Sequence, residues 1–203
     1  MNLLFLLRQT LVIAPPILIT SVGACLSEKS GVVNIGLEGT MLSAAFATAT
    51  VNILTGNPYL GILAGIIVGG LVSGIHAVIS IHLKGNQIIS GVAINLFAVA
   101  TTSFLIKTIF KAAGSTPAGK NLANKELILI IIYTLAILTY FFLYKTILGL
   151  RIRAVGEHPL AADTVGISVY KIRYISVILS GMFAGLGGAY LTGVMLPSFS
   201  NNM

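Results

Sequence analysis

The most constraining feature of this chain is a series of six apolar stretches, each about as long as a helix needs to cross a bilayer. A membrane-spanning helix takes about 20 predominantly apolar residues. The stretches cover residues 3–26, 31–54, 58–81, 88–106, 127–144 and 175–196, and short polar connections between them hold most of the charge. The pattern predicts an all-α integral membrane protein, a polytopic bundle of about six transmembrane helices.

Composition excludes a soluble domain. Only 8% of the 203 residues are charged and the mean hydropathy is +1.00, whereas a soluble domain carries about 25% charged residues. No polar stretch is long enough to form a second domain. Residues 1–203 are therefore predicted to form one transmembrane domain, in which Pro15 and Pro16 kink the first helix.

The net charge of +7 is explained by membrane topology rather than by nucleic acid. Lys and Arg gather in short loops, where they set orientation and meet anionic lipid headgroups, and no cluster interleaves them with stacking aromatic residues. Loop 145–173 contains five basic residues and loop 107–125 contains four, with one helix between them. Loop 145–173 contains three arginines, which favours its placement in the cytoplasm. The turns at Lys84 and at Glu28-Lys29 then share that side, and loop 107–125 lies outside.

Glycines in residues 58–81 predict close helix packing. Gly61, Gly65 and Gly69 are spaced four apart, and Gly70 and Gly74 follow. Small residues at this spacing form a flat stripe against which another helix can pack. The spacing does not identify that helix.

Sites for catalysis are not apparent. Residues 114–121 (GSTPAGKN) fit the phosphate-loop pattern GxxxxGK, but Asn121 replaces the Ser or Thr that ligates magnesium. A membrane helix precedes the motif where a strand is required, and Pro117 removes a backbone donor. His76, His82 and His158 are isolated, so no pair has metal-ligand spacing. We predict no catalytic residue, no metal and no cofactor.

Polar residues within apolar stretches are candidates for a substrate pathway. Asn34 and Glu38 lie four apart and would share one face of a helix. A charge near the bilayer centre costs roughly 2.5–3.5 kcal/mol and normally faces a cavity or a partner. Alternatively, Glu38 lies near the membrane surface and pairs with Lys29 or caps a helix. Asn95 stands in a similar setting, because residues 90–95 (SGVAIN) echo residues 30–34 (SGVVN) and suggest two helices that enter the membrane alike.

Loop 149–167 (GLRIRAVGEHPLAADTVGI) begins with Arg151 and Arg153 and contains two acidic residues. Residues 160–164 can form a short helix with Pro159 in its first turn, and Lys171 and Arg173 close the loop before the next membrane helix. Two interpretations remain open at this point. The loop is either a docking element for a soluble partner or a solvated connection that only follows the positive-inside rule.

Two long motifs resemble a known family. Residues 27–39 (SEKSGVVNIGLEG) resemble the N-terminal signature of ABC-importer permeases of the branched-chain amino acid, simple-sugar and nucleoside class. Loop 149–167, followed by residues 180–190 (SGMFAGLGGAY), resembles the cytoplasmic loop and next helix of the same family. The match runs over nearly the whole chain and is closest to the nucleoside-type branch.

The resemblance implies a multi-pass subunit of the cell membrane that imports a small polar solute, a nucleoside or a simple sugar. An ABC ATPase subunit would hydrolyse ATP, a second permease subunit would complete the pore, and an extracytoplasmic substrate-binding protein would deliver the solute. Region 149–173 would be the cytoplasmic coupling loop. The residues that match the family's ATPase-coupling loop are Arg151, Arg153, Gly156, Glu157, Pro159, Ala161, Ala162, Asp163, Gly166 and Ile167. Asn34, Glu38 and Asn95 are assigned to the pathway from membrane physics.

Two departures from the family open alternatives. The stretch between Gly114 and Glu126 is shorter than in typical members. Members also continue through several more helices where this chain ends at Asn201-Asn202-Met203, which predicts that C-terminal helices are missing. The alternatives are an ion-coupled secondary transporter in which Glu38 carries the proton or sodium, and a permease fragment that does not transport.

Overall fold

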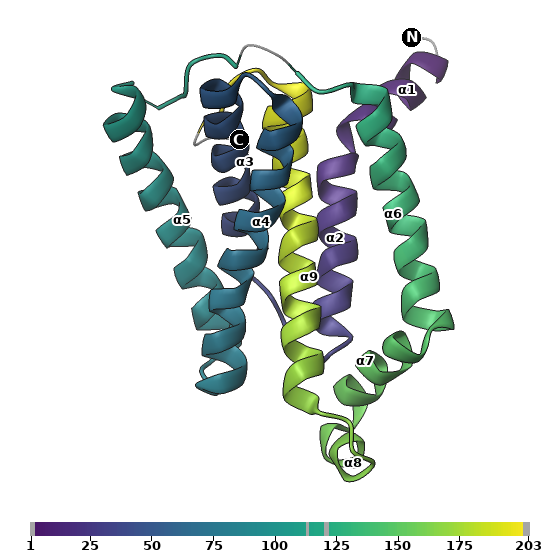
Figure 1. Cartoon of the computed structure of the whole chain (residues 1–203). Coiled ribbons are helices and arrows are strands. Elements are labelled where there is room, and N and C mark those ends of the chain that lie inside the picture. Colours follow the sequence, from purple (N-terminus) through teal and green to yellow (C-terminus); the bar gives the residue numbers. More distant parts are fainter. Residues whose placement is uncertain (1–2, 113, 120–121, 201–203) are drawn as a thin grey trace.

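The computed structural model describes residues 3–112, 114–119 and 122–200, and this part of the chain is a bundle of helices (Figure 1). Its only β-type pairing is an isolated bridge between Ser115 and Ser200. In chain order the elements are α1 (Leu3–Ile13), α2 (Pro15–Glu28), α3 (Leu37–Thr55), α4 (Pro58–Ala77), η1 (Val78–His82), α5 (Gln87–Phe110), α6 (Lys125–Lys145), α7 (Ile147–Glu157), α8 (Pro159–Thr164), α9 (Val169–Tyr190) and η2 (Leu191–Met195), where η marks a π-helical turn.

The helices confirm the prediction of about six membrane spans. Five are long and apolar enough to cross a membrane: Leu37–Thr55, Pro58–His82, Gln87–Phe110, Lys125–Lys145 and Val169–Met195. Helices α1 and α2 meet the same test only as a pair, bent by 50° at their break, and they make a sixth span if the pair is counted as one. The bend falls at Pro15 and Pro16, as predicted, because proline lacks the N–H that would continue the helix.

The second span begins later than predicted. Residues 32–36 are not helical, and α3 starts at Leu37 rather than at residue 31. The cause is a helix stop at the end of α2. Gly31 has φ +82°, the Gly31 N–H donates to the Glu28 carbonyl over 2.9 Å, and the Val32 N–H donates to the Ser27 carbonyl over 3.3 Å. This is the Schellman arrangement, for which glycine is the favoured residue.

The last span also differs from its predicted bounds. It begins at Val169, six residues before the predicted start at residue 175, so Lys171 and Arg173 lie on α9 and not in the loop. The predicted short helix is confirmed as α8, with Pro159 as its first residue. A second Schellman stop follows α8 at Gly166, which has φ +82°.

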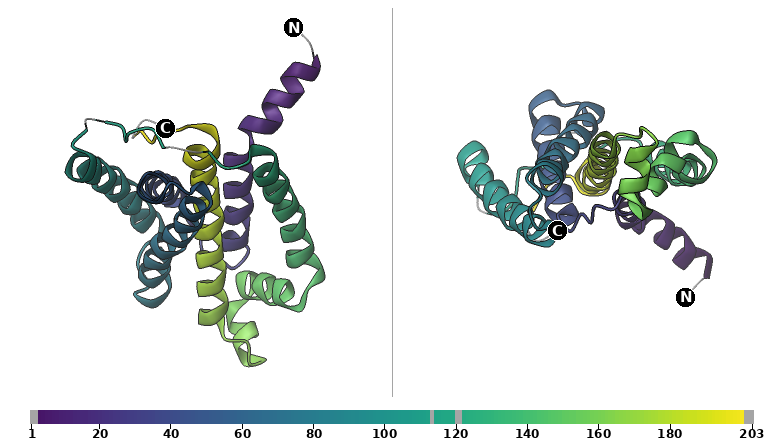
Figure 2. Two further views of the ribbon diagram at one scale, coloured as in Figure 1. Left: turned by 45° about the horizontal axis from the view of Figure 1, so that its top comes forward. Right: turned by 90° about the horizontal axis from the view of Figure 1, so that it is seen from below.

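Helix α9 lies at the centre of the bundle, between α2 and α4, and packs on α2, α3 and α4 (Figures 1 and 2). The glycine stripe of α4 faces it. A Cβ at Gly69 would meet the Gly181 carbonyl and lie 2.7 Å from Gly185 Cα, whereas a Cβ at Gly61 would lie 2.7 Å from the Thr48 carbonyl of α3. The predicted close packing is confirmed, with α9 and α3 as the partners. Gly74 has open space beside it.

The loops predicted to share one side of the membrane do lie at one end of the bundle. Figure 1 shows the turn after α2, the turn between η1 and α5, and the α7–α8 unit at the lower end, with the connection from α5 to α6 at the upper end. The assignment of the lower end to the cytoplasm stays a prediction.

The segment that fits the phosphate-loop pattern lies at the upper end and pairs with the chain after η2. The Thr116 N–H donates to the Phe199 carbonyl over 2.9 Å, and the Gly119 N–H donates to the Pro197 carbonyl over 2.6 Å. These two backbone donors are therefore not available to a phosphate, and helix α5 precedes the segment where a strand would be needed. Lys120 and Asn121 lie outside the described residues, as do Asn201, Asn202 and Met203.

Two alanine substitutions on α4 test this packing. We expect Gly69→Ala to destabilise the bundle by about 1–3 kcal/mol, because a new methyl group in a tight contact forces backbone apart. The matched control is Gly74→Ala on the same helix, which should be neutral or slightly stabilising because alanine favours helix over glycine. Thermal unfolding in detergent measures both, and equal losses for the two variants would contradict the proposed contact.

Candidate functional site

Residues 32–36 connect α2 to α3 without forming a helix. Side chains from other helices form hydrogen bonds with the backbone of this segment. An unpaired backbone group in an apolar interior is costly, so such a segment persists only where partners exist. Gln87 Oε1 accepts from the Val33 N–H over 2.8 Å, and Asn95 Nδ2 donates to the Ile35 carbonyl over 3.2 Å. Both partners lie on α5, which therefore holds the segment in place.

His76 of α4 holds the same segment from the other side. Its ring is completely buried, with Nε2 at 3.1 Å from the Val33 carbonyl and Nδ1 at 3.0 Å from Ser90 Oγ. Because a carbonyl only accepts, Nε2 carries the hydrogen in the bond to Val33, and Nδ1 forms the second hydrogen bond, with the Ser90 hydroxyl. Sequence reasoning treated His76 as isolated, since its partners are 14 and 43 residues away along the chain.

Asn34 does not share a helix face with Glu38, and that expectation was wrong. Asn34 lies in the unwound segment and is buried. Its Oδ1 accepts from the Gly36 N–H over 3.1 Å, and its Nδ2 donates to Ser73 Oγ over 3.3 Å. The suggested similarity between residues 30–34 and 90–95 also fails, because the latter lie inside α5. Residues 30–34 differ from residues 90–95 because the helix before them stops at Gly31.

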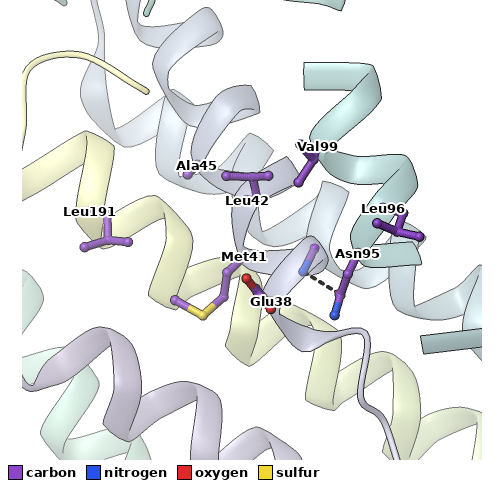
Figure 3. Close-up of a pocket in the computed structure, with 9 residues that line it drawn as sticks. Glu38, Met41, Leu42, Ala45, Asn95, Leu96, Val99 and Leu191 are labelled. Atoms are coloured by element: carbon purple, nitrogen blue, oxygen red, sulfur yellow. Dashed lines mark hydrogen bonds between the residues drawn. The ribbon is translucent and has the colours of Figure 1, made fainter. Parts of the chain in front are cut away.

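Glu38 and Asn95 meet at a cavity of about 320 Å³ between α3, α5 and η2 (Figure 3). The Asn95 side chain forms part of the wall and also braces it, since Oδ1 accepts from the Gly39 N–H over 2.8 Å. Glu38 is exposed, and within the described part of the chain no Lys or Arg pairs with it, so the suggested pairing with Lys29 is not seen. The other lining residues are Gly39, Met41, Leu42, Ala45, Leu96, Val99 and Leu191.

The cavity combines one carboxylate with an apolar wall. Glu38 lies in the first turn of α3, where the positive end of the helix dipole stabilises its negative charge. Leu42, Val99 and Leu191 provide apolar surface opposite it. Such a site can accept hydrogen bonds from a small solute and cover its apolar face. Because Glu38 and Leu96 are exposed, the cavity is open at the surface of this chain.

The residues of the α7–α8 unit divide into an exposed set and an anchoring set. Among the ten residues matched to the coupling loop, the exposed ones are Arg151, Glu157, Ala161, Asp163 and Gly166. Two apolar neighbours are also exposed, with Leu160 at 84% and Val165 at 73%. This set can contact a partner.

The anchoring set attaches the unit to the bundle. Ala162 is buried in a cluster with Ile152 and Val155, which packs on Leu26 and Ile172, and Ile167 borders it. Pro159, Arg153 and Gly156 are half-buried. The Arg153 guanidinium lies 5.0 Å from the centre of the Tyr144 ring, a cation–π contact.

Comparison with known proteins decides the family. The profile of the family described as "Branched-chain amino acid transport system / permease component" matches residues 6–198. The chain belongs to this family. It is therefore a permease, a multi-pass protein of the cell membrane whose role is transport. No solved structure matches it.

Three curated relatives illustrate the branch. The guanosine ABC transporter permease protein NupQ of Bacillus subtilis is 40% identical over 95% of this permease and 68% of its own length. The nucleoside ABC transporter permease protein NupC of Lactococcus lactis is 36% identical over 98% of this permease and 70% of the length of NupC. A putative glucose ABC transporter permease of Haloferax volcanii is 38% identical over 92% of this permease and 62% of the length of that relative. The permease thus spans about two thirds of each relative.

Substitutions of Asn95 test its bracing role. Asn95→Leu should leave the Gly39 N–H and the Ile35 carbonyl without these partners, at about 1–3 kcal/mol for the buried Gly39 N–H. Asn95→Asp keeps an acceptor for Gly39 and loses only the donor to Ile35. We expect hydrogen exchange at the Gly39 amide to accelerate strongly in the Leu variant and little in the Asp variant. Equal protection in both would contradict the assigned hydrogen bonds.

Proposed function

We propose that this permease is the membrane subunit of an ABC importer for nucleosides or simple sugars. The names of its relatives support the substrate class: guanosine, nucleoside and glucose permeases. The Glu38 cavity forms part of the solute pathway, and its carboxylate accepts hydrogen bonds from the hydroxyl or N–H groups of such solutes. The α7–α8 unit docks an ABC ATPase subunit, which supplies the energy.

The observation that carries this proposal is the form of the α7–α8 unit. It extends beyond the lower end of the bundle (Figure 1) and is ordered by its own apolar anchor of Ile152, Val155 and Ala162. At the same time it presents Leu160 and Val165 outward among charged residues. Exposed apolar side chains that are rimmed by charged residues are typical of a surface that a protein partner buries.

The remaining partners follow from the open cavity and from the family. A second permease subunit would cover the exposed side of the Glu38 cavity and complete the pathway. An extracytoplasmic binding protein would deliver the solute to the upper end of the bundle, opposite the α7–α8 unit. The chain spans about two thirds of the length of its relatives. We therefore propose these partners for the assembled transporter and not for this chain alone.

Charge reversal on the exposed set tests docking. We expect the combined variant Arg151→Glu, Glu157→Lys and Asp163→Lys to lower recovery of an ABC ATPase with the tagged permease by about tenfold or more. Reversed charges at an interface oppose their former partners, at several kcal/mol. The measurement is affinity purification from detergent-solubilised native membranes, with ATP hydrolysis in the eluate as readout.

A matched control for docking is Lys84→Glu, a charge reversal at the same end of the bundle but outside the α7–α8 unit. This variant should recover the ATPase at the parent level. Undiminished recovery with the triple variant would refute docking through this surface.

Uptake of labelled guanosine into vesicles that contain the permease and its partner subunits tests the energy source and the pathway. We expect uptake to require ATP and to survive ionophores. Glu38→Gln should lower uptake by about tenfold, the usual cost of about 1.4 kcal/mol for one weakened hydrogen bond, while ATPase recovery stays unchanged. Uptake driven by an ion gradient and abolished in this variant would instead support the secondary transporter, and no uptake would support a fragment.

A further inference from the structure

The C-terminal end of α7 approaches the turn after α2 (residues 29–31) at Gly156. A Cβ at Gly156 would meet the Lys29 carbonyl oxygen and would lie 3.3 Å from the Gly31 nitrogen. From the other side, a Cβ at Gly31 would lie 3.4 Å from Gly156 Cα. No side chain separates Gly156 from Gly31, so the two backbones are in direct contact at this point.

Arg173 of α9 holds the same turn from a second side. Its Nε donates to the Ser30 carbonyl over 3.2 Å, and Ser30 is completely buried. A Cβ at Gly31 would lie 3.2 Å from a terminal nitrogen of this guanidinium. Residues 29–31 are thus clamped between α7, which belongs to the docking unit, and the central helix α9.

The chain that leaves this turn leads straight to the cavity. Residues 32–36 follow it without a helix, and Glu38 comes two residues later. The backbone of Val33 and Ile35 forms hydrogen bonds with the side chains of His76, Gln87 and Asn95. These bonds restrain the segment, so it cannot shift freely when the turn is displaced. Close-packed interiors transmit strain rather than damp it. A shift of the turn must therefore move the first turn of α3 or break these hydrogen bonds.

We propose that residues 29–36 form a mechanical link between the α7–α8 unit and the Glu38 cavity, with Gly156 and Arg173 as its positioning residues. The link rests on the proposed function, since it transmits a movement that ATPase docking would drive. In this role Gly156 acts inward on the Lys29 carbonyl and makes no contact with the ATPase. Arg173 has no part in solute binding or docking and acts only through the turn.

The experiment measures cavity accessibility and requires no transport. In a Cys25→Ser background, which removes the only cysteine, Leu42→Cys places one thiol on the cavity wall. The permease is purified with its ATPase, and the rate of maleimide labelling is compared with and without a non-hydrolysable ATP analogue. We expect the analogue to change the rate by about fivefold or more, the low end of usual coupling between sites.

Two variants break the link at different points. Arg173→Gln removes the charged donor to the Ser30 carbonyl, and Gly156→Ala forces α7 away from Lys29. In both we expect the response to the analogue to vanish, and in Arg173→Gln, which lies outside the α7–α8 unit, the ATPase is still recovered. The controls are Lys171→Gln, an exposed residue on the same helix as Arg173, and Gly74→Ala, which has open space beside it. Both should keep the full response.

The outcomes separate the two proposals. If no ATPase is recovered with the parent chain, the proposed function fails and the link fails with it. If the ATPase is recovered but the analogue leaves the labelling rate unchanged, the link alone is overturned. The link is equally overturned if Arg173→Gln, recovered with its ATPase, retains the full response. A response lost in Arg173→Gln and kept in Lys171→Gln supports it.

Discussion

The backbone of residues 32–36 must find hydrogen-bond partners inside an apolar bundle, and much of the structure serves that need. Val32 and Asn34 are buried, and an unsatisfied N–H or carbonyl in an apolar interior costs several kcal/mol. Gln87, His76 and Asn95 provide the partners from two different helices. These three side chains thereby hold α3, α4 and α5 in fixed relation at the depth where the cavity forms. These three polar side chains therefore have a structural role.

Close packing of small residues around α9 makes that arrangement possible. Lipid tails are as apolar as leucine, so helices in a membrane associate through tight contacts and not through release of water. Gly69 of α4 faces Gly181 and Gly185, and Gly188 faces the Met41 backbone of α3. With its small residues inward, α9 can stand between three neighbours at once. The outer faces of α5 and α6 remain apolar and exposed, as expected of helices in contact with lipid.

The α7–α8 unit has two faces with separate tasks. Its buried residues join the cluster around Leu26 and Ile172 and give the unit a defined position. Its exposed face carries charges together with Leu160 and Val165. Family resemblance alone grouped ten residues as one coupling loop, whereas the structure separates those that can reach a partner from those that hold the loop. Gly156 belongs to the second group, because it touches the turn after α2.

Local properties of the sequence were sufficient to predict the number of spans, the proline kink, the short helix α8 and the family. Each depends on hydrophobic length, backbone chemistry or a contiguous motif, which a linear sequence displays directly. Whether residues 31–36 continue the helix depended on Gly31 and on distant partners, so the shared face of Asn34 and Glu38 was mispredicted. Likewise, the role of His76 and the contact of Gly156 with Lys29 were decided only in three dimensions. Their partners lie far away along the chain, and only packing around α9 brings them together.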